Sequence, residues 1–257
     1  MSTAQYYLRD ARYGFNVGNG LILDPNTESQ PRSQPEEKYG HLIMGMTAEN
    51  LAEKYGISRE EQDAFAYKSQ MSAVKAIDTG RFKDEIVPVS IPVRKGDPIV
   101  FDVDEFPRRD TSLEKMAKLK PAFKKDGTVT AGNSSGRNDG SAALLLASEE
   151  SVQKQGLKPL GRIVAAASAG VDPRYMGFGP VPAIRKVLEK TGMSLSDMGL
   201  IEINEAFAAQ TLACVKELGV DQDRLNVNGG AIALGHPLGC SGARILVTLA
   251  HEMGKRN

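Results

Sequence analysis

The stretch GGAIALGHPLGCSGAR (residues 229–244) places five glycines, one proline, one histidine and one cysteine between a strand-like NVN and a helix-like ILVTLAHEM. Most glycine-rich turns of this kind only tighten the chain against the start of a helix. Here, however, Pro237 restricts the backbone directly after His236, and the next helix is expected to point its N-terminal N–H groups at the same space. A histidine in such a place suits a general base or an oxyanion donor.

Two nucleotide-binding motifs can be excluded for this turn. Residues 230–235 have the G-x-x-x-x-G spacing of a P-loop, but His236 and Pro237 stand where Lys and Ser or Thr are required. The G-x-G-x-x-G pattern of dinucleotide-binding folds is also absent there. The turn therefore does not predict phosphate chemistry.

Outward from this turn, the second half of the chain alternates apolar runs with helical periods, which predicts an α/β layered fold. The apolar runs predict strands at 141–147, 161–170, 200–204 and 226–234. The segments between and after them predict helices at 148–156, 181–192, 205–219 and 241–254.

The first half reads as helical and irregular. Residues 1–40 are polar and rich in turn residues, and TAENLAEKYG (residues 47–56) predicts a helix that ends at its last glycine. Ser58 and Glu61 have the spacing of a capping box, and apolar residues then recur at three–four spacing as far as Gly80.

We place the boundary between the helical, irregular first half and the alternating second half at residues 130–137. Two further segments precede this boundary. EIVPVSIPV (residues 85–93) alternates like a strand, but its two prolines confine it to an edge or a bulge. Thr111 and Glu114 have the spacing of a second capping box, which predicts another helix.

Composition and charge narrow the class of protein. The 257 residues carry 32 Lys and Arg against 32 Asp and Glu, and this zero net charge argues against broad nucleic-acid binding and polybasic membrane attachment. No apolar run of about 18 residues is present, so we expect no membrane span. Two cysteines do not make a disulfide framework, which favours a reducing cytoplasm. The three histidines lack ligand spacing, so we expect no metal site.

Asn204, in NEAF (residues 204–207), stands at another predicted junction between a strand and a helix. Asparagine is a common N-cap, and helix capping is the ordinary interpretation of this residue. However, ligand groups in α/β folds collect at such junctions. We therefore expect Asn204 and His236 to form two walls of one site.

The longer motifs around these two residues resemble the thiolase family, whose members make or break 3-ketoacyl-CoA by Claisen condensation or thiolysis. The resemblance rests on the motifs NEAFAAQ, NVNGGAIALGHPLG, TVTAGNSSGRNDGSAALLL, MGFGPVPA and GRFKDEIVPV. It covers nearly the whole chain. It implies a thiolase-like layered α/β fold, here incomplete, with a helical, irregular loop domain.

The resemblance also implies roles for particular residues. His236 matches the family histidine that activates the nucleophilic thiol and helps to form an oxyanion hole. Asn204 matches the asparagine that orients a water in that hole. Ser135 matches a serine that contacts the pantetheine arm, and Arg108 falls where a basic residue lies near the CoA nucleotide. Further positions match apolar residues around the acyl and pantetheine groups: Met44, Met176, Phe123 and Phe207. The apolar residues could equally be plain core, and Arg108 a solvated surface charge.

One departure bears on the substrate. Short-chain biosynthetic members of the family often carry a histidine directly before the Met-Gly of residues 44–45. This chain has Ile43 there, and His41 lies two residues earlier. The resemblance therefore does not imply strict specificity for acetoacetyl-CoA.

Both catalytic cysteines of the family are expected to lie outside this chain, one upstream and one in a Cys-Gly-Gly-Gly-like segment downstream. Cys214 reads as a core residue. Cys240 stands at a predicted helix N-terminus, where the pKa of a thiol tends to fall, but the family commonly has a small packing residue there. We therefore expect the chain to be inactive alone and to expose apolar sheet surface.

The resemblance divides the chain into a loop domain (1–136), the last strand and helix of the N-terminal half (137–158) and a truncated C-terminal half (159–257). It implies no cofactor other than the CoA thioester substrate, a place in fatty-acid metabolism such as β-oxidation, and a homo-oligomer, dimer or tetramer, in the full-length form. A ketoacyl synthase is the nearest rival among enzymes, but that relative more often presents two histidines in its site than the NEAF and GHP pair, which argues against it. Two alternatives stay open: a non-catalytic CoA- or acyl-binding protein of thiolase-like fold, and a structural fragment without ligand affinity.

Overall fold

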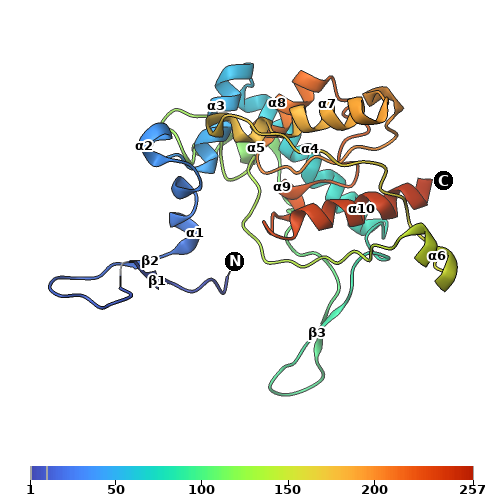
Figure 1. Cartoon of the computed structure of the whole chain (residues 1–257), viewed down its shortest axis with the longest axis horizontal. Coiled ribbons are helices and arrows are strands. Elements are labelled where there is room, and N and C mark those ends of the chain that lie inside the picture. The colour runs from blue at the N-terminus through green and yellow to red at the C-terminus, as the bar shows by residue number, and fades with distance from the viewer. Residues whose placement is uncertain (1, 10, 257) are drawn as a thin grey trace.

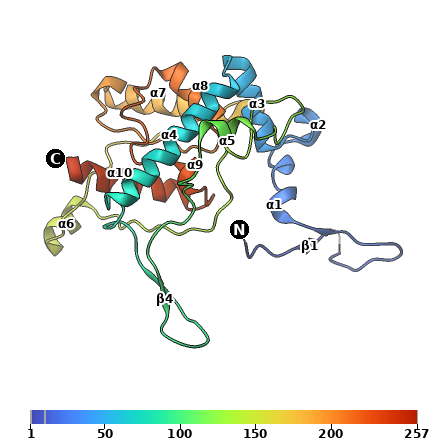
Figure 2. The same cartoon turned by 180° about the vertical axis from the view of Figure 1, so that it is seen from behind.

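The computed structural model describes residues 2–9 and 11–256, which form a helical body with two projecting hairpins (Figure 1). Helices α3, α4, α7 and α8 lie together on one side of the body, and α9 and α10 lie below them (Figures 1 and 2). The helices are α1 (Pro25–Glu28), α2 (Glu36–Tyr39), α3 (Met44–Tyr55), α4 (Arg59–Asp78), α5 (Leu113–Ala117), α6 (Glu149–Gln155), α7 (Pro180–Thr191), α8 (Ala208–Leu218), α9 (Ala231–Leu234) and α10 (Ser241–Arg256). The 3-10 helices are η1 (Pro31–Ser33), η2 (Pro173–Phe178) and η3 (Leu195–Asp197), and the strands are β1 (Tyr7–Leu8), β2 (Ile22–Leu23), β3 (Val89–Ile91) and β4 (Ile99–Phe101).

Helix α8 is the centre of the hydrophobic core. Its first eight residues, AAQTLACV (residues 208–215), are all buried, and its small side chains allow other helices to approach closely. Apolar side chains from α3, α4 and α7 pack with it, including Leu51, Phe65 and Val181. Burial of this apolar surface is the main favourable contribution to folding.

The predicted helix behind Ser58 is confirmed, together with its capping box. Ser58 Oγ accepts a hydrogen bond from the Glu61 N–H at 3.1 Å, and Glu61 Oε2 accepts one from the Ser58 N–H at 2.7 Å. The helix α4 that follows runs for 20 residues and buries Phe65, Ala66 and Ala73.

Two other helix starts differ from the prediction. α3 begins at Met44 rather than near residue 47, with Ile43 as its N-cap. The predicted capping box of Thr111 is wrong, because Ser112 is the N-cap of α5 and its side chain accepts from the Lys115 N–H. Neighbouring Thr and Ser compete for the cap, and the chain uses the later one.

The predicted strands 141–147 and 161–170 are wrong in this structure. Both segments lie outside any strand and are exposed, with Leu145 at 88% and Ile163 at 66% of full exposure. A buried strand needs hydrogen-bonded neighbours and a layer on each face, and the described residues supply neither to these two segments. The chain exposes apolar surface here, but on irregular segments and not on the expected sheet.

The predicted strands 200–204 and 226–234 are reduced to one parallel bridge between Ile201 and Leu225. The side chain of Asn226 continues this bridge, because its Oδ1 accepts from the Ile203 N–H and its Nδ2 donates to the Ile203 carbonyl. Asn226 has a positive φ of 44°, so its own backbone turns away and residues 231–234 become α9 instead of a strand.

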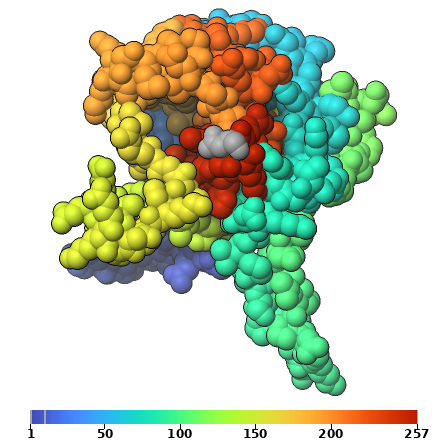
Figure 3. Space-filling model, turned by 90° about the vertical axis from the view of Figure 1, so that its right-hand side faces the viewer, coloured from blue at the N-terminus to red at the C-terminus, as the bar shows by residue number. Residues whose placement is uncertain are grey.

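Both two-stranded antiparallel sheets project from the body (Figure 1), and Figure 3 shows the β3–β4 hairpin standing out from it. β3 pairs with β4, with Ser90 opposite Val100, and every residue of the two strands is exposed. The predicted edge position of residues 85–93 therefore holds in a hairpin with no covering layer. No helix in the described part of the chain is long and apolar enough to cross a bilayer.

The capping box yields a test of stability. Ser58→Ala removes the acceptor for the Glu61 N–H in a helix that packs on the core, so the free energy of unfolding should fall by about 1 kcal/mol. Urea denaturation followed by circular dichroism measures this. Ser148→Ala is the matched control, because it removes the cap of α6, which buries no residue, and it should change global stability by less than half as much. Equal losses in both variants would contradict this role of α4.

Candidate active site

Three segments that are far apart in the sequence cross at the candidate site and are joined by main-chain hydrogen bonds. The Ser135 N–H donates to the Ala206 carbonyl at 3.0 Å, and the Ala208 N–H donates to the Asn133 carbonyl at 2.9 Å. The His236 N–H donates to the Gly136 carbonyl at 3.1 Å. The loop at 133–136 is therefore bonded both to the NEAF segment and to the glycine–histidine turn.

This crossing brings Asn204 and His236 together. Asn204 Nδ2 lies 3.4 Å from His236 Nε2, at the long end of hydrogen-bond distance. Asn204 does not cap a helix, since α8 starts at Ala208 with Phe207 as its N-cap. Asn204 Oδ1 is buried and has no hydrogen-bond partner within residues 2–9 and 11–256. The capping interpretation is thus excluded, and the side chain faces the histidine instead.

Ser241 sets the tautomer of His236. Ser241 Oγ donates to the Pro237 carbonyl at 3.0 Å and lies 2.6 Å from His236 Nδ1. With the hydroxyl proton assigned to that carbonyl, Nδ1 donates to Ser241 Oγ, and Asn204 Nδ2, which can only donate, then faces an acceptor at Nε2. The neutral ring then carries its free lone pair at Nε2, on the side of Asn204.

The surroundings keep this ring neutral. Burial lowers the pKa of His236 below its ordinary value of 6.5, and the nearby positive charge of Arg244 lowers the pKa further. Both effects disfavour the imidazolium. At neutral pH, His236 therefore presents an unprotonated nitrogen that can accept a proton.

Neither cysteine has an activated thiol. Burial raises the pKa of Cys214 to about 11, and burial also raises the pKa of Cys240. Cys240 precedes α10 directly, and the positive charge of Arg244 acts in the opposite direction, but desolvation is the larger effect. The lowered pKa that a helix N-terminus can give is not found at Cys240.

The glycines of the turn serve the protein's own packing more than the approach of a substrate. A Cβ on Gly230 would lie 2.2 Å from the carboxyl carbon of Glu205. A Cβ on Gly235 would lie 2.4 Å from the side chain of Asn138. Of the five glycines of the turn, only Gly239 and Gly242 have no atoms within 4 Å of such a Cβ.

An aromatic pair lies next to the crossing. Phe123 and Phe207 meet edge to face, with ring centroids 5.9 Å apart. Phe207 also forms an antiparallel bridge with Ser134. The ring of Phe123 packs on Gly45, so α3 begins beside this pair, and the Met44 N–H there donates to Gln30 Oε1.

The remaining candidate residues lie around this centre. Ser135 is joined to the NEAF segment through its backbone and is half-buried. Arg108 has an exposed side chain, and its N–H donates to Gln70 Oε1 at 2.8 Å. Met176 lies on η2 with 45% exposure, and no hydrogen bond or ring contact joins it to the other candidates within the described residues.

Sequence reasoning missed Ser241 and Arg244. Ser241 follows the histidine by five residues and is the first residue of α10. The sequence signal that could have identified it is a hydroxyl residue in the first turn of the helix that follows a Gly-His-Pro loop. Arg244 lies one turn further along the same helix. Among the described residues, no group of three or more His, Cys, Asp or Glu is arranged to hold a metal ion.

The neutral histidine yields a pH prediction. The pKa of His236 is lower in the folded state than in the unfolded chain, so this group costs stability as pH falls from 6.5 through the folded pKa, and costs nothing above 6.5. The ring signals of His236 are identified by their absence from the NMR spectrum of His236→Gln. In the parent chain these signals should titrate with a midpoint below pH 6.5. Arg244→Met should raise that midpoint without reaching 6.5, because burial is the larger cause. A midpoint at or above 6.5 in the parent chain would contradict this description.

Comparison with known proteins agrees with the motifs. Residues 1–150 match the family model described as the thiolase N-terminal domain, and residues 157–257 match the thiolase C-terminal domain. An acetyl-CoA acetyltransferase of Pseudomonas aeruginosa is 56% identical over 257 residues, and one of Allochromatium vinosum is 57% identical. Each alignment covers 100% of this chain and 64% of the relative, so the chain spans less than two thirds of the length of these relatives.

Solved structures give the same result for the fold. The crystal structure of the Bacillus anthracis acetyl-CoA acetyltransferase superposes with a TM-score of 0.93 at 53% identity, over 99% of this chain and 63% of that one. Human mitochondrial 3-ketoacyl-CoA thiolase in complex with CoA superposes with a TM-score of 0.88 at 48% identity, over 99% of this chain and 62% of that one. The chain has the thiolase-like α/β fold and belongs to the thiolase family.

Proposed function

We propose that this chain carries the histidine–asparagine side of a thiolase-type acyltransfer site that acts on CoA thioesters. The reaction is the Claisen condensation of acetyl-CoA, or the thiolysis of 3-ketoacyl-CoA, through a cysteine thioester. The observation that carries the proposal is His236 Nε2 lying 3.4 Å from Asn204 Nδ2 in a half-buried place, where burial lowers the pKa of the ring. The names of the relatives, acetyl-CoA acetyltransferase and 3-ketoacyl-CoA thiolase, support the same reaction class.

In this proposal His236 acts first as a base. Its Nε2 accepts the proton of a cysteine thiol, and the resulting thiolate attacks the thioester carbonyl. The imidazolium then carries a proton on Nε2, which donates a hydrogen bond to the oxygen that becomes negative. When this intermediate collapses, the bond from the carbonyl carbon to the CoA sulfur breaks, CoA leaves as a thiol with that proton, and the acyl group stays on the cysteine. Asn204 lies at hydrogen-bond distance from the same nitrogen and helps to stabilise this charge, directly or through a water.

The thiol that forms the thioester is neither Cys214 nor Cys240 in this proposal. Both have a raised pKa, and Cys214 is fully buried. We therefore expect the chain alone not to turn over.

The other candidates are proposed to hold the CoA thioester. Ser135 would contact the pantetheine arm and Arg108 the nucleotide. Met44, Met176, Phe123 and Phe207 would surround the acyl and pantetheine groups. The edge-to-face pair of Phe123 and Phe207, next to the bonded loop of Ser135, supports an apolar wall beside a polar anchor.

Four further points stay predictions. They are the domain boundaries at residues 136 and 158, the absence of a cofactor, assembly as a dimer or tetramer in the full-length form, and a cytoplasmic role in fatty-acid metabolism. A second function, CoA or acyl binding without transfer, is favoured by one observation: neither thiol is prepared for attack. The neutral histidine paired with Asn204 favours transfer, because binding alone needs no base.

The test combines binding with mass spectrometry. The chain is titrated with acetyl-CoA and acetoacetyl-CoA while the His236 ring signals are followed by NMR, and the same samples are mapped for acyl adducts and assayed for free CoA. We expect the thioesters to shift the His236 signals, with no adduct on either cysteine and no release of CoA. Ser135→Ala should weaken the response several-fold, and Ser148→Ala, on exposed α6, is the control.

A thioester on Cys240 with release of CoA would overturn the assignment of the nucleophile. Saturable CoA binding that leaves the His236 signals unchanged would favour the binding protein instead.

A further inference from the structure

Glu205 directly follows Asn204, but its side chain points into the core. It is 1% exposed, and three groups donate hydrogen bonds to its carboxylate: Ser69 Oγ at 2.6 Å, Asn226 Nδ2 at 2.8 Å and the Ile232 N–H at 3.2 Å. Burial raises the pKa of Glu205, and these hydrogen bonds oppose that rise. Since all three partners donate, the ionised carboxylate satisfies every one of them.

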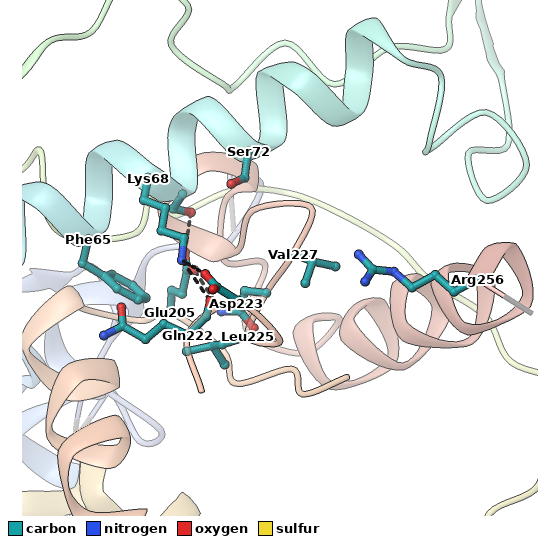
Figure 4. A pocket seen from close by; sticks show the side chains of 11 residues that line it. Phe65, Lys68, Ser72, Glu205, Gln222, Asp223, Leu225, Val227 and Arg256 are labelled. Atoms are coloured by element: carbon teal, nitrogen blue, oxygen red, sulfur yellow. Dashed lines mark hydrogen bonds and ion pairs between the residues drawn. The ribbon is translucent and has the colours of Figure 1, made fainter. Parts of the chain in front are cut away.

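The glycine–histidine turn lies directly against this carboxylate. The Gly230 N–H donates to Ser69 Oγ at 3.0 Å, and a Cβ on Gly230 would lie 2.2 Å from the carboxyl carbon of Glu205. On the other side, a Cβ on Gly229 would lie 2.6 Å from the Ser69 carbonyl oxygen. Figure 4 shows Glu205 beneath α4, near Phe65 and Lys68, in a pocket of about 220 Å³ that Ser69 and Asn226 also line. Gly229 and Gly230 therefore lie in direct contact with α4 and Glu205, with no room for a side chain at either position.

Only a few residues of the chain separate this contact from His236. Ile232, which donates to Glu205, is the second residue of α9. This helix ends at Leu234 with Gly235 as its C-cap, and His236 follows, with its N–H bonded to the Gly136 carbonyl. The carboxylate and the histidine are thus connected through the single helical turn of α9.

We propose that Glu205 is a positioning residue: its buried carboxylate holds the 229–236 turn and thereby keeps His236 Nε2 against Asn204. Adjacent residues then act on the two sides of one strand-like segment, with Asn204 facing the histidine and Glu205 holding the turn that carries it. The importance of this geometry for acyl transfer rests on the proposed function.

Glu205→Gln tests the proposal with little change in size. A glutamine has one acceptor oxygen and one NH₂ group, so an N–H must face either Asn226 Nδ2 or the pair formed by Ser69 and the Ile232 N–H. Ser69→Ala is the milder second variant, because it removes one donor to the carboxylate and the acceptor for the Gly230 N–H.

Glu49→Gln is the matched control. Glu49 is also a buried carboxylate, 4% exposed, and it accepts hydrogen bonds from Thr128 and Val129 rather than from the histidine turn. It should lose stability as Glu205→Gln does, with a much smaller change at His236, because Glu49 has no hydrogen bond to the histidine turn among the described residues.

The readout is the histidine itself, so it does not depend on CoA binding or turnover. The rate at which diethyl pyrocarbonate modifies His236 is measured by peptide mapping, with His41 and His251 as internal references, and the pKa of His236 is measured by NMR. In Glu205→Gln we expect His236 to react at least threefold faster and its pKa to rise towards 6.5, because a loosened turn exposes the ring. Ser69→Ala should change both in the same direction by less.

A folded Glu205→Gln that keeps the parent rate and pKa at His236 would overturn the proposal, as would equal changes in Glu49→Gln. If Glu205→Gln does not fold, parent values in Ser69→Ala overturn it in the same way. If CoA thioesters leave the His236 signals of the parent chain unchanged while Glu205→Gln still alters His236, the result counts against the proposed function alone.

Discussion

The crossing of the 133–136 loop with the NEAF segment and the histidine turn is the constraint on which the rest of the site depends. Main-chain hydrogen bonds from Ser135, Ala208 and His236 join segments that are separated by about 70 and 100 residues along the chain. Closing such long loops costs conformational entropy, so the bonds persist only because the helical core already brings the segments together. The burial of α8, whose first residue takes part in the crossing, is what links core and site.

Buried carboxylates, rather than a continuous sheet, hold the loops around this crossing. Glu49 receives the N–H groups of Thr128 and Val129, upstream of the 133–136 loop. Glu205 receives donors from α4, from Asn226 and from α9. Glu252 receives Asn228 Nδ2 and forms ion pairs with arginine side chains on two sides. Buried charge is tolerated because it is paired or fully hydrogen-bonded, and loss of one partner leaves a costly unpaired group. This makes loop geometry sensitive to single substitutions.

The helices could be predicted from the sequence because their signals are local. The spacing of Ser58 and Glu61 defines the start of α4 within a few residues, and glycines end α3, α7 and α8. The strands could not, because pairing depends on residues elsewhere: the apolar run at 141–147 has strand composition but no neighbour, and 226–234 is diverted by the positive φ of Asn226. In the site, the motifs single out Asn204 and His236. The tautomer set by Ser241 and the lowering of the pKa by Arg244 depend on distances that no spacing rule gives.

The measurement that tests this account most directly is native-state hydrogen exchange of single backbone amides by NMR. If the crossing is one cooperative unit built on the core, the N–H groups of Ser135, Ala208 and His236 should exchange with similar, high protection, far slower than those of the exposed β3–β4 hairpin. A His236 amide that exchanges as fast as the hairpin amides, while Ala208 stays protected, would show that the histidine turn is not held by the crossing and would contradict the account.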